Sequence, residues 1–157
     1  MGGPVSSVNQ ANPIRLFVCH VYRPDDDYHR VFEYLESASN FFYRNTSTPE
    51  KRPQGDREAL REDLRRQIND AEVVILTASL YRRNIDWVEF QLHCAKAFDK
   101  AVVVLEPFGA QDTIAPAVQE VADEVVPWDQ RQLVDAVKRQ ARHEETTRFD
   151  TIEFKLD

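Results

Sequence analysis

Three short apolar runs, rich in β-branched residues, constrain the fold of this chain more than any other feature of its sequence. They are residues 14–19, 73–76 and 102–105. Their continuous apolar character is the pattern of strands that are buried on both faces. Helical patterns separate the runs along the chain, and this alternation is typical of a parallel sheet covered by helices on both sides. The sequence therefore predicts an α/β fold of the flavodoxin-like class.

The segments between these runs complete the predicted domain. Apolar residues at helical spacing predict helices over residues 24–35, 56–70, 87–98 and 130–142. Two further strands are predicted at residues 41–44 and 124–127. Residues 1–13 are expected to be a mobile lead-in, residues 14–142 a single domain, and residues 143–157 a C-terminal extension. That extension ends in residues 151–156, which alternate like a half-exposed strand.

Composition limits the classes of function. A length of 157 residues with 42% hydrophobic and 30% charged residues suits one globular domain. A net charge of -7 disfavours a general nucleic-acid binder. No apolar run approaches the ~20 residues of a membrane helix, and the N-terminus lacks the pattern of a signal peptide. Cys19 and Cys94 lie inside apolar patterns, which predicts reduced, buried thiols. We therefore expect a cytoplasmic protein without membrane or nucleic-acid partners.

In a sheet of this class, ligands bind outside the carboxyl ends of the strands, where the strand order reverses. Aromatic and charged side chains follow these ends: His20, Tyr22 and Arg23 after the first run, and Trp87 after the second. Each has an alternative structural interpretation, such as a histidine with satisfied hydrogen bonds or a tryptophan that anchors the core. The sequence contains no GxGxxG, GxxxxGK, HExxH or GxSxG motif, which argues against dinucleotide, Walker, metal and ordinary hydrolase sites of those kinds.

Five segments, taken together in their order along the chain, resemble the TIR-like family that includes the Thoeris antiphage defence proteins. The resemblance extends in order from Ile14 to about Arg142, and it rests on residues 16–28, 45–49, 85–92, 102–109 and 122–128. Related TIR domains break the bond between nicotinamide and ribose in NAD. Several make cyclic ADP-ribose isomers that activate a separate effector protein.

The resemblance implies NAD as a substrate, no permanently bound cofactor, and self-assembly through the TIR-like domain. It also implies that NAD or an ADP-ribose derivative contacts the strand ends and adjoining loops, at Cys19, His20, Tyr22, Arg23, Asn45, Thr46, Tyr81, Trp87 and Phe108. The family's catalytic glutamate lies four residues beyond the tryptophan. In this chain that position is Gln91.

A neutral amide at position 91 lacks the charge that stabilises the ribosyl cation formed when nicotinamide leaves. Loss of one such group lowers the rate on the order of a hundredfold or more, so the chain is expected to be nearly inactive. Glu89 does not replace it, because a two-residue step on a helix reaches roughly the opposite face. Gln91 could be an engineered inactivating substitution, which we favour at this point. It could also be a natural residue, or a different carboxylate could serve.

Two other functions fit parts of the sequence. A non-catalytic module that binds nucleotides or assembles with proteins is consistent with Gln91 and the acidic surface. A response-regulator function fits the fold class and the acids at residues 25–27. Those acids suit a helix start better, and no lysine ends a later strand to complete a phosphoacceptor site.

Overall fold

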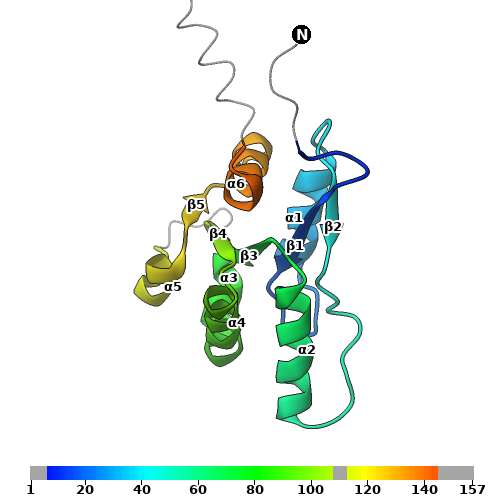
Figure 1. The fold of residues 1–157 in the computed structure, drawn as a ribbon. Helices are drawn as coiled ribbons and strands as arrows, with labels where there is room; N and C mark the ends of the chain where they lie inside the picture. Colours follow the sequence, from blue (N-terminus) through cyan, green and yellow to red (C-terminus); the bar gives the residue numbers. More distant parts are fainter. Residues whose placement is uncertain (1–6, 108–112, 145–157) are drawn as a thin grey trace, which may run out of the picture.

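The computed structural model of this chain describes residues 7–107 and 113–144. Within these residues a five-stranded, all-parallel sheet has the strand order β2-β1-β3-β4-β5 (Figure 1). The predicted flavodoxin-like α/β fold is therefore confirmed. Along the chain the elements are β1 (Ile14–Val18), α1 (Asp26–Glu36), β2 (Tyr43–Asn45), α2 (Arg57–Asn69), β3 (Val73–Thr77), α3 (Ala78–Arg83), α4 (Ile85–Ala97), β4 (Ala101–Leu105), α5 (Pro116–Val121), β5 (Glu124–Val126) and α6 (Gln130–Arg142).

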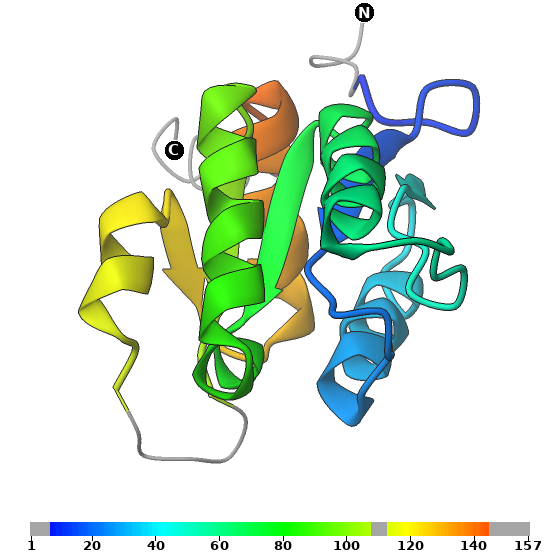
Figure 2. The same cartoon turned by 90° about the horizontal axis from the view of Figure 1, so that it is seen from below.

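Helices cover both faces of the sheet, and each face has its own core. Val74 of β3 lies in one core with Leu64 of α2, and the next residue, Ile75, lies in the other core with Leu133 of α6. Successive side chains of a strand point to opposite faces. A strand covered on both sides therefore needs a continuous apolar run. Figure 2 shows α2 and α4 on the near side of β3, with α6 behind the sheet.

Of the long helices in the described residues, α1, α2 and α6 begin where the sequence supplies a capping residue, whereas Asn84 at the start of α4 makes no side-chain cap. The side chains of Asp25, Asp56 and Asp129 accept hydrogen bonds from backbone N–H groups three residues later, at the starts of α1, α2 and α6. These bonds satisfy N–H groups that have no partner within the helix. The predicted helices over residues 56–70 and 130–142 are confirmed to within one residue at each end.

Three short elements differ from the sequence-based expectation. α3 was not predicted, because Thr77 at its start makes no side-chain cap and the helix has only six residues. α5 was also not predicted, although Pro116 stands at its first turn, where proline is favoured. β2 begins at Tyr43, two residues later than expected. The carbonyl of Phe42 still accepts a hydrogen bond from the N–H of Ile14 at 3.0 Å.

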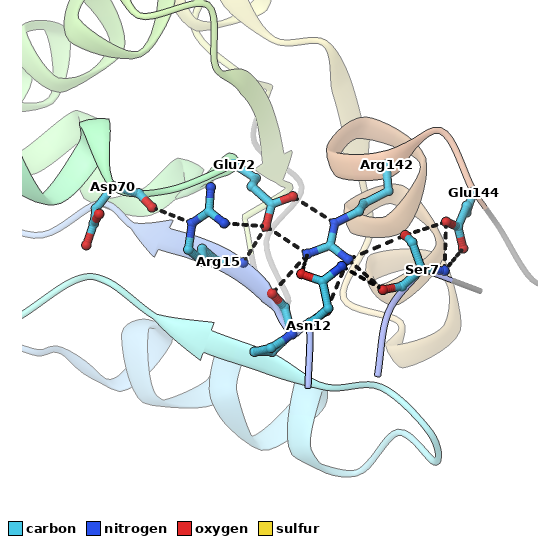
Figure 3. Close-up of polar contacts among 8 residues, drawn as sticks. Ser7, Asn12, Arg15, Asp70, Glu72, Arg142 and Glu144 are labelled. Atoms are coloured by element: carbon cyan, nitrogen blue, oxygen red, sulfur yellow. Dashed lines mark hydrogen bonds and ion pairs between the residues drawn. The ribbon is translucent and has the colours of Figure 1, made fainter. Parts of the chain in front are cut away.

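The N-terminal segment is held by the last residue of α6. The Arg142 guanidinium donates to the backbone carbonyl oxygens of Ser7, Asn12 and Pro13 at 2.8, 3.1 and 2.9 Å (Figure 3). Val8 is 5% exposed in one of the two cores. Residues 7–13 are therefore packed against the domain, and the mobility expected for residues 1–13 stays a prediction.

The other parts of the two predicted terminal segments, residues 1–6 and 145–157, lie outside the described residues, so the strand expected at residues 151–156 stays a prediction. No helix in residues 7–107 or 113–144 is long and apolar enough to cross a membrane.

Candidate functional site

A pocket opens beside the carboxyl end of β1, near the point where the strand order reverses. Its volume is about 300 Å³. It lies between the loop that follows β1, the start of α2 and the first turn of α4. The lining combines two aromatic rings, three apolar side chains, a glycine and three charged groups, which are Tyr22, Trp87, Val21, Leu60, Leu64, Gly55, Arg52, Asp56 and Arg57. Tyr22 and Trp87 are thus the two predicted site residues that line this pocket.

Gln91 lies on the buried face of α4, one turn after the pocket residue Trp87, and is 0% exposed. Its amide nitrogen donates to the carbonyl oxygens of His20 at 2.8 Å and Trp87 at 3.1 Å. Its amide oxygen accepts from the backbone N–H of His20 at 3.2 Å. A carboxylate in this place would face two carbonyl oxygens and could donate to neither. The surroundings of position 91 therefore suit an amide.

Glu89, the other acidic candidate on α4, accepts a hydrogen bond from the Tyr81 hydroxyl at 3.0 Å. This contact lies within the α3–α4 pair, and neither residue lines the pocket. Glu89 is therefore not placed to supply the carboxylate that position 91 lacks.

His20 is buried, with 1% exposure, and each of its polar groups has a partner. The backbone N–H and the carbonyl oxygen of His20 are both hydrogen-bonded to the side chain of Gln91. The ring of His20 has two further partners. Its Nδ1 accepts from the N–H of Tyr22 at 3.0 Å, so the ring proton lies on Nε2 and is donated to Oε1 of Gln67 at 2.9 Å. Burial lowers the pKa of His20, opposed in part by Gln67 and Asp63. This geometry matches a histidine that fixes a loop.

Tyr22 adopts a left-handed backbone conformation, with φ of 61°. This conformation is uncommon for a residue other than glycine and needs support from its surroundings. Support comes from the bond to His20 and from Asp63, whose Oδ2 accepts from the Tyr22 hydroxyl at 2.7 Å. Burial and this hydrogen bond raise the pKa of Tyr22. The ring of Tyr22 is thereby fixed as one wall of the pocket.

Because neutral His20 is part of this support, we expect the free energy of unfolding to fall as the pH drops below the ordinary histidine pKa of 6.5. The folded state has the lower pKa and takes up the proton later than the unfolded state. The contribution of neutral His20 to the free energy of unfolding is therefore fully present above about pH 6.5. Below that pH the free energy of unfolding declines by up to about 1.4 kcal/mol per pH unit. Urea denaturation of the parent chain and of His20→Gln measures this. Equal slopes between about pH 6.5 and 5 in both proteins would contradict the assignment.

Two predicted residues, Asn45 and Thr46, hold the chain at the end of β2, and Thr46 does so through Gln67. Thr46 donates through its hydroxyl to the backbone carbonyl of Gln67 at 2.8 Å. The side chain of Asn45 donates to the Tyr28 hydroxyl at 3.1 Å and accepts from the N–H of Ser47 at 2.9 Å. Both residues shape the loop that follows β2, and neither lines the pocket.

The other predicted residues are not brought to the pocket by the described structure. Cys19 is 3% exposed, and burial raises the pKa of its thiol. Cys94 is also a buried free thiol, as expected. Arg23 is exposed and does not line the pocket. Phe108 lies outside the described residues.

Sequence reasoning missed the cationic part of the pocket and the polar network behind it. Arg52 lies in the loop between β2 and α2, and Arg57 is the first residue of α2, with its guanidinium 5.1 Å from the centre of the Trp87 ring. Gln67 is 1% exposed. The burial of Gln67 could have been predicted from the sequence, because Gln67 falls three residues after Leu64 on the apolar face of α2. A polar residue on an apolar helix face requires buried partners.

Comparison with known proteins identifies the family of this fold. The family described as "Thoeris protein ThsB, TIR-like domain" matches residues 17–112, which is more than half of the 157 residues. The match runs from within β1 through β4, and it includes the residues that line the pocket and Gln91. A search of curated proteins gave no match. The chain therefore belongs to the TIR-like domain family of the Thoeris protein ThsB.

Proposed function

We propose that this chain is a TIR-like domain of Thoeris antiphage defence that binds NAD or an ADP-ribose derivative without cleaving it. The chemistry of the pocket supports binding. The Trp87 ring has the Arg57 guanidinium over one face and can stack a base on the other, and Arg52 and Arg57 offer guanidinium groups that suit phosphate. A volume of about 300 Å³ is at the small end for ligand pockets. It suits one half of a dinucleotide, with the other half outside.

The proposal that cleavage does not occur rests on the hydrogen bonds of Gln91. Departure of nicotinamide leaves an oxocarbenium-like ribosyl cation, which a carboxylate stabilises and a neutral amide does not. Both ends of the Gln91 amide are engaged with His20, and the nitrogen also bonds the carbonyl of Trp87. Position 91 then serves to join α4 to the loop after β1. This supports glutamine as the natural residue over an engineered substitution.

Calorimetry with NAD and with ADP-ribose tests the proposed binding. We expect the parent chain to bind and Trp87→Leu to bind at least about tenfold more weakly, since stacking of one base on an aromatic side chain contributes about 1–3 kcal/mol. Trp128→Phe is the matched control, because Trp128 packs against Tyr34 and does not line the pocket. Equal affinity in Trp87→Leu would place the ligand elsewhere. No binding by the parent chain would favour a module that assembles with proteins only.

A catalytic function is the second candidate, because the carboxylate of Asp56 lines the same pocket as Trp87. Its Oδ1 accepts from the N–H of Ala59 at 3.1 Å, which leaves its other oxygen to face a ligand. If Asp56 stabilises the ribosyl cation, the domain cleaves NAD. Its product would then be the cyclic ADP-ribose-type messenger that the family resemblance implies, with an effector protein as the receiver.

A further inference from the structure

A single side-chain oxygen joins the two loops that border the pocket. Oε1 of Gln67 lies 2.9 Å from Nε2 of His20 and accepts from the backbone N–H of Thr48 at 3.0 Å. His20 belongs to the loop after β1, which carries Tyr22. Thr48 belongs to the loop after β2, which carries Arg52. The two pocket walls are thus connected through one residue of α2.

The amide nitrogen of Gln67 adds a second connection to the same wall. It donates to Oδ2 of Asp63 at 2.7 Å, and this oxygen also accepts from the Tyr22 hydroxyl. Gln67 therefore reaches Tyr22 by two routes, one through the ring of His20 to the Tyr22 N–H and one through Asp63 to the Tyr22 hydroxyl. A left-handed tyrosine persists when its surroundings fix it from more than one direction.

We propose that Gln67 is a positioning residue that makes the loops after β1 and β2 open as one unit and sets Tyr22 against the pocket. Gln67 does not line the pocket itself, so it acts through His20, Asp63 and Thr48. The coupling between the loops is independent of what the pocket binds. Only the effect of this coupling on the affinity for a nucleotide rests on the proposed function.

Amide hydrogen exchange followed by NMR tests the coupling without a ligand. In Gln67→Leu, we expect the amides of Tyr22 and Thr48 to exchange at least about tenfold faster together, relative to core amides of β4. The control is Val137→Ala, which removes buried apolar groups from the core on the other face of the sheet and touches none of this network. Faster exchange at Thr48 alone, or an equal effect in the control, overturns the proposal.

The reciprocal variant separates coupling from the direct loss of a hydrogen bond. Tyr22→Phe removes the hydroxyl bond to Asp63 and leaves the partner of the Thr48 N–H intact. If the loops open as one unit, Thr48 exchanges several-fold faster in Tyr22→Phe, and this effect disappears when Gln67→Leu is already present. An unchanged Thr48 amide in Tyr22→Phe contradicts the coupling.

Calorimetry with ADP-ribose tests the consequence for the site. We expect Gln67→Leu to weaken binding at least about tenfold and Val137→Ala to leave it unchanged. Suppose that hydrogen exchange shows the coupling to be lost in Gln67→Leu. If this variant still binds ADP-ribose as tightly as the parent chain, the positioning role is overturned. If the parent chain binds no ADP-ribose, the proposed function fails, and the exchange measurements still decide whether Gln67 couples the loops.

Discussion

Replacing Gln91 by glutamate is expected to destabilise the domain by about 3 kcal/mol near pH 7.5, because a buried charge would replace a fully hydrogen-bonded amide. In the parent chain the amide nitrogen donates to the carbonyl oxygens of His20 and Trp87, and the side chain is 0% exposed. A carboxylate loses both bonds and faces both oxygens. Urea denaturation of the parent and of Gln91→Glu measures the difference directly.

The loss of stability in Gln91→Glu, relative to the parent chain, should depend on pH. Burial between carbonyl oxygens raises the pKa of a carboxyl above the value of about 4.3 that it has in the unfolded chain. The folded state then keeps its proton to a higher pH than the unfolded state does. The lost stability is therefore largest above the raised pKa and shrinks as the pH is lowered from about 7.5 toward 5.

Gln91→Met is the matched control for this prediction. It removes the same hydrogen bonds and adds no charge, so its loss of stability should not vary over this pH range. A Gln91→Glu protein with the unfolding free energy of the parent at every pH would contradict the account of position 91. It would also show that a carboxylate fits at this buried position of α4.

Arg142→Ala is expected to lower the free energy of unfolding by about 3 kcal/mol. Arg142 bonds both oxygens of Glu72, at 2.8 and 3.0 Å, and their side chains are 11% and 16% exposed. The same guanidinium holds three backbone carbonyls of residues 7–13. The variant leaves Glu72 with less compensation for its burial and releases the segment that places Val8 in the core. Denaturation and amide exchange of residues 7–13 measure both effects.

Two variants test whether the geometry of Arg142 is responsible. Arg142→Lys keeps the charge but cannot make the paired contacts, so an intermediate loss is expected. Arg44→Ala removes an exposed ion pair with Asp70, at 3.7 Å, and should change stability by less than about 1 kcal/mol. An Arg142→Ala protein that is destabilised no more than Arg44→Ala would show that the cluster in Figure 3 contributes little.

Much of the fold followed from the sequence because the strands have apolar residues on both faces. Residues 73–76 and 102–105 could be read as buried strands, and Asp56 marked the start of α2. α3 could not be read in the same way, since six residues without a side-chain cap carry little periodic signal. The packing of residues 7–13 depends on Arg142, which lies about 130 positions away in the chain, so local composition did not reveal it.

The candidate site could be predicted only in part, because many of its contacts join residues that are distant in the chain. Tyr22 and Trp87, which line the pocket, were predicted because they follow strands along the chain. The partners of His20 come from α2 and α4, and no local pattern pairs it with Gln67 or Gln91. The two glutamines lie on helix faces that are otherwise apolar, and such positions can be searched for in a sequence. The left-handed conformation of Tyr22 has no sequence signal, because it is imposed by those contacts.

The most direct test of nucleotide binding without cleavage is to incubate the chain with NAD and measure two quantities in the same sample. Equilibrium dialysis gives the bound NAD, and chromatography gives the nicotinamide released. Binding without cleavage predicts saturable binding, intact NAD after incubation, and nicotinamide release no faster than in Asp56→Asn or in buffer. Nicotinamide release by the parent chain that Asp56→Asn abolishes would contradict it and assign catalysis to Asp56. Absence of bound NAD and ADP-ribose would contradict the nucleotide site altogether.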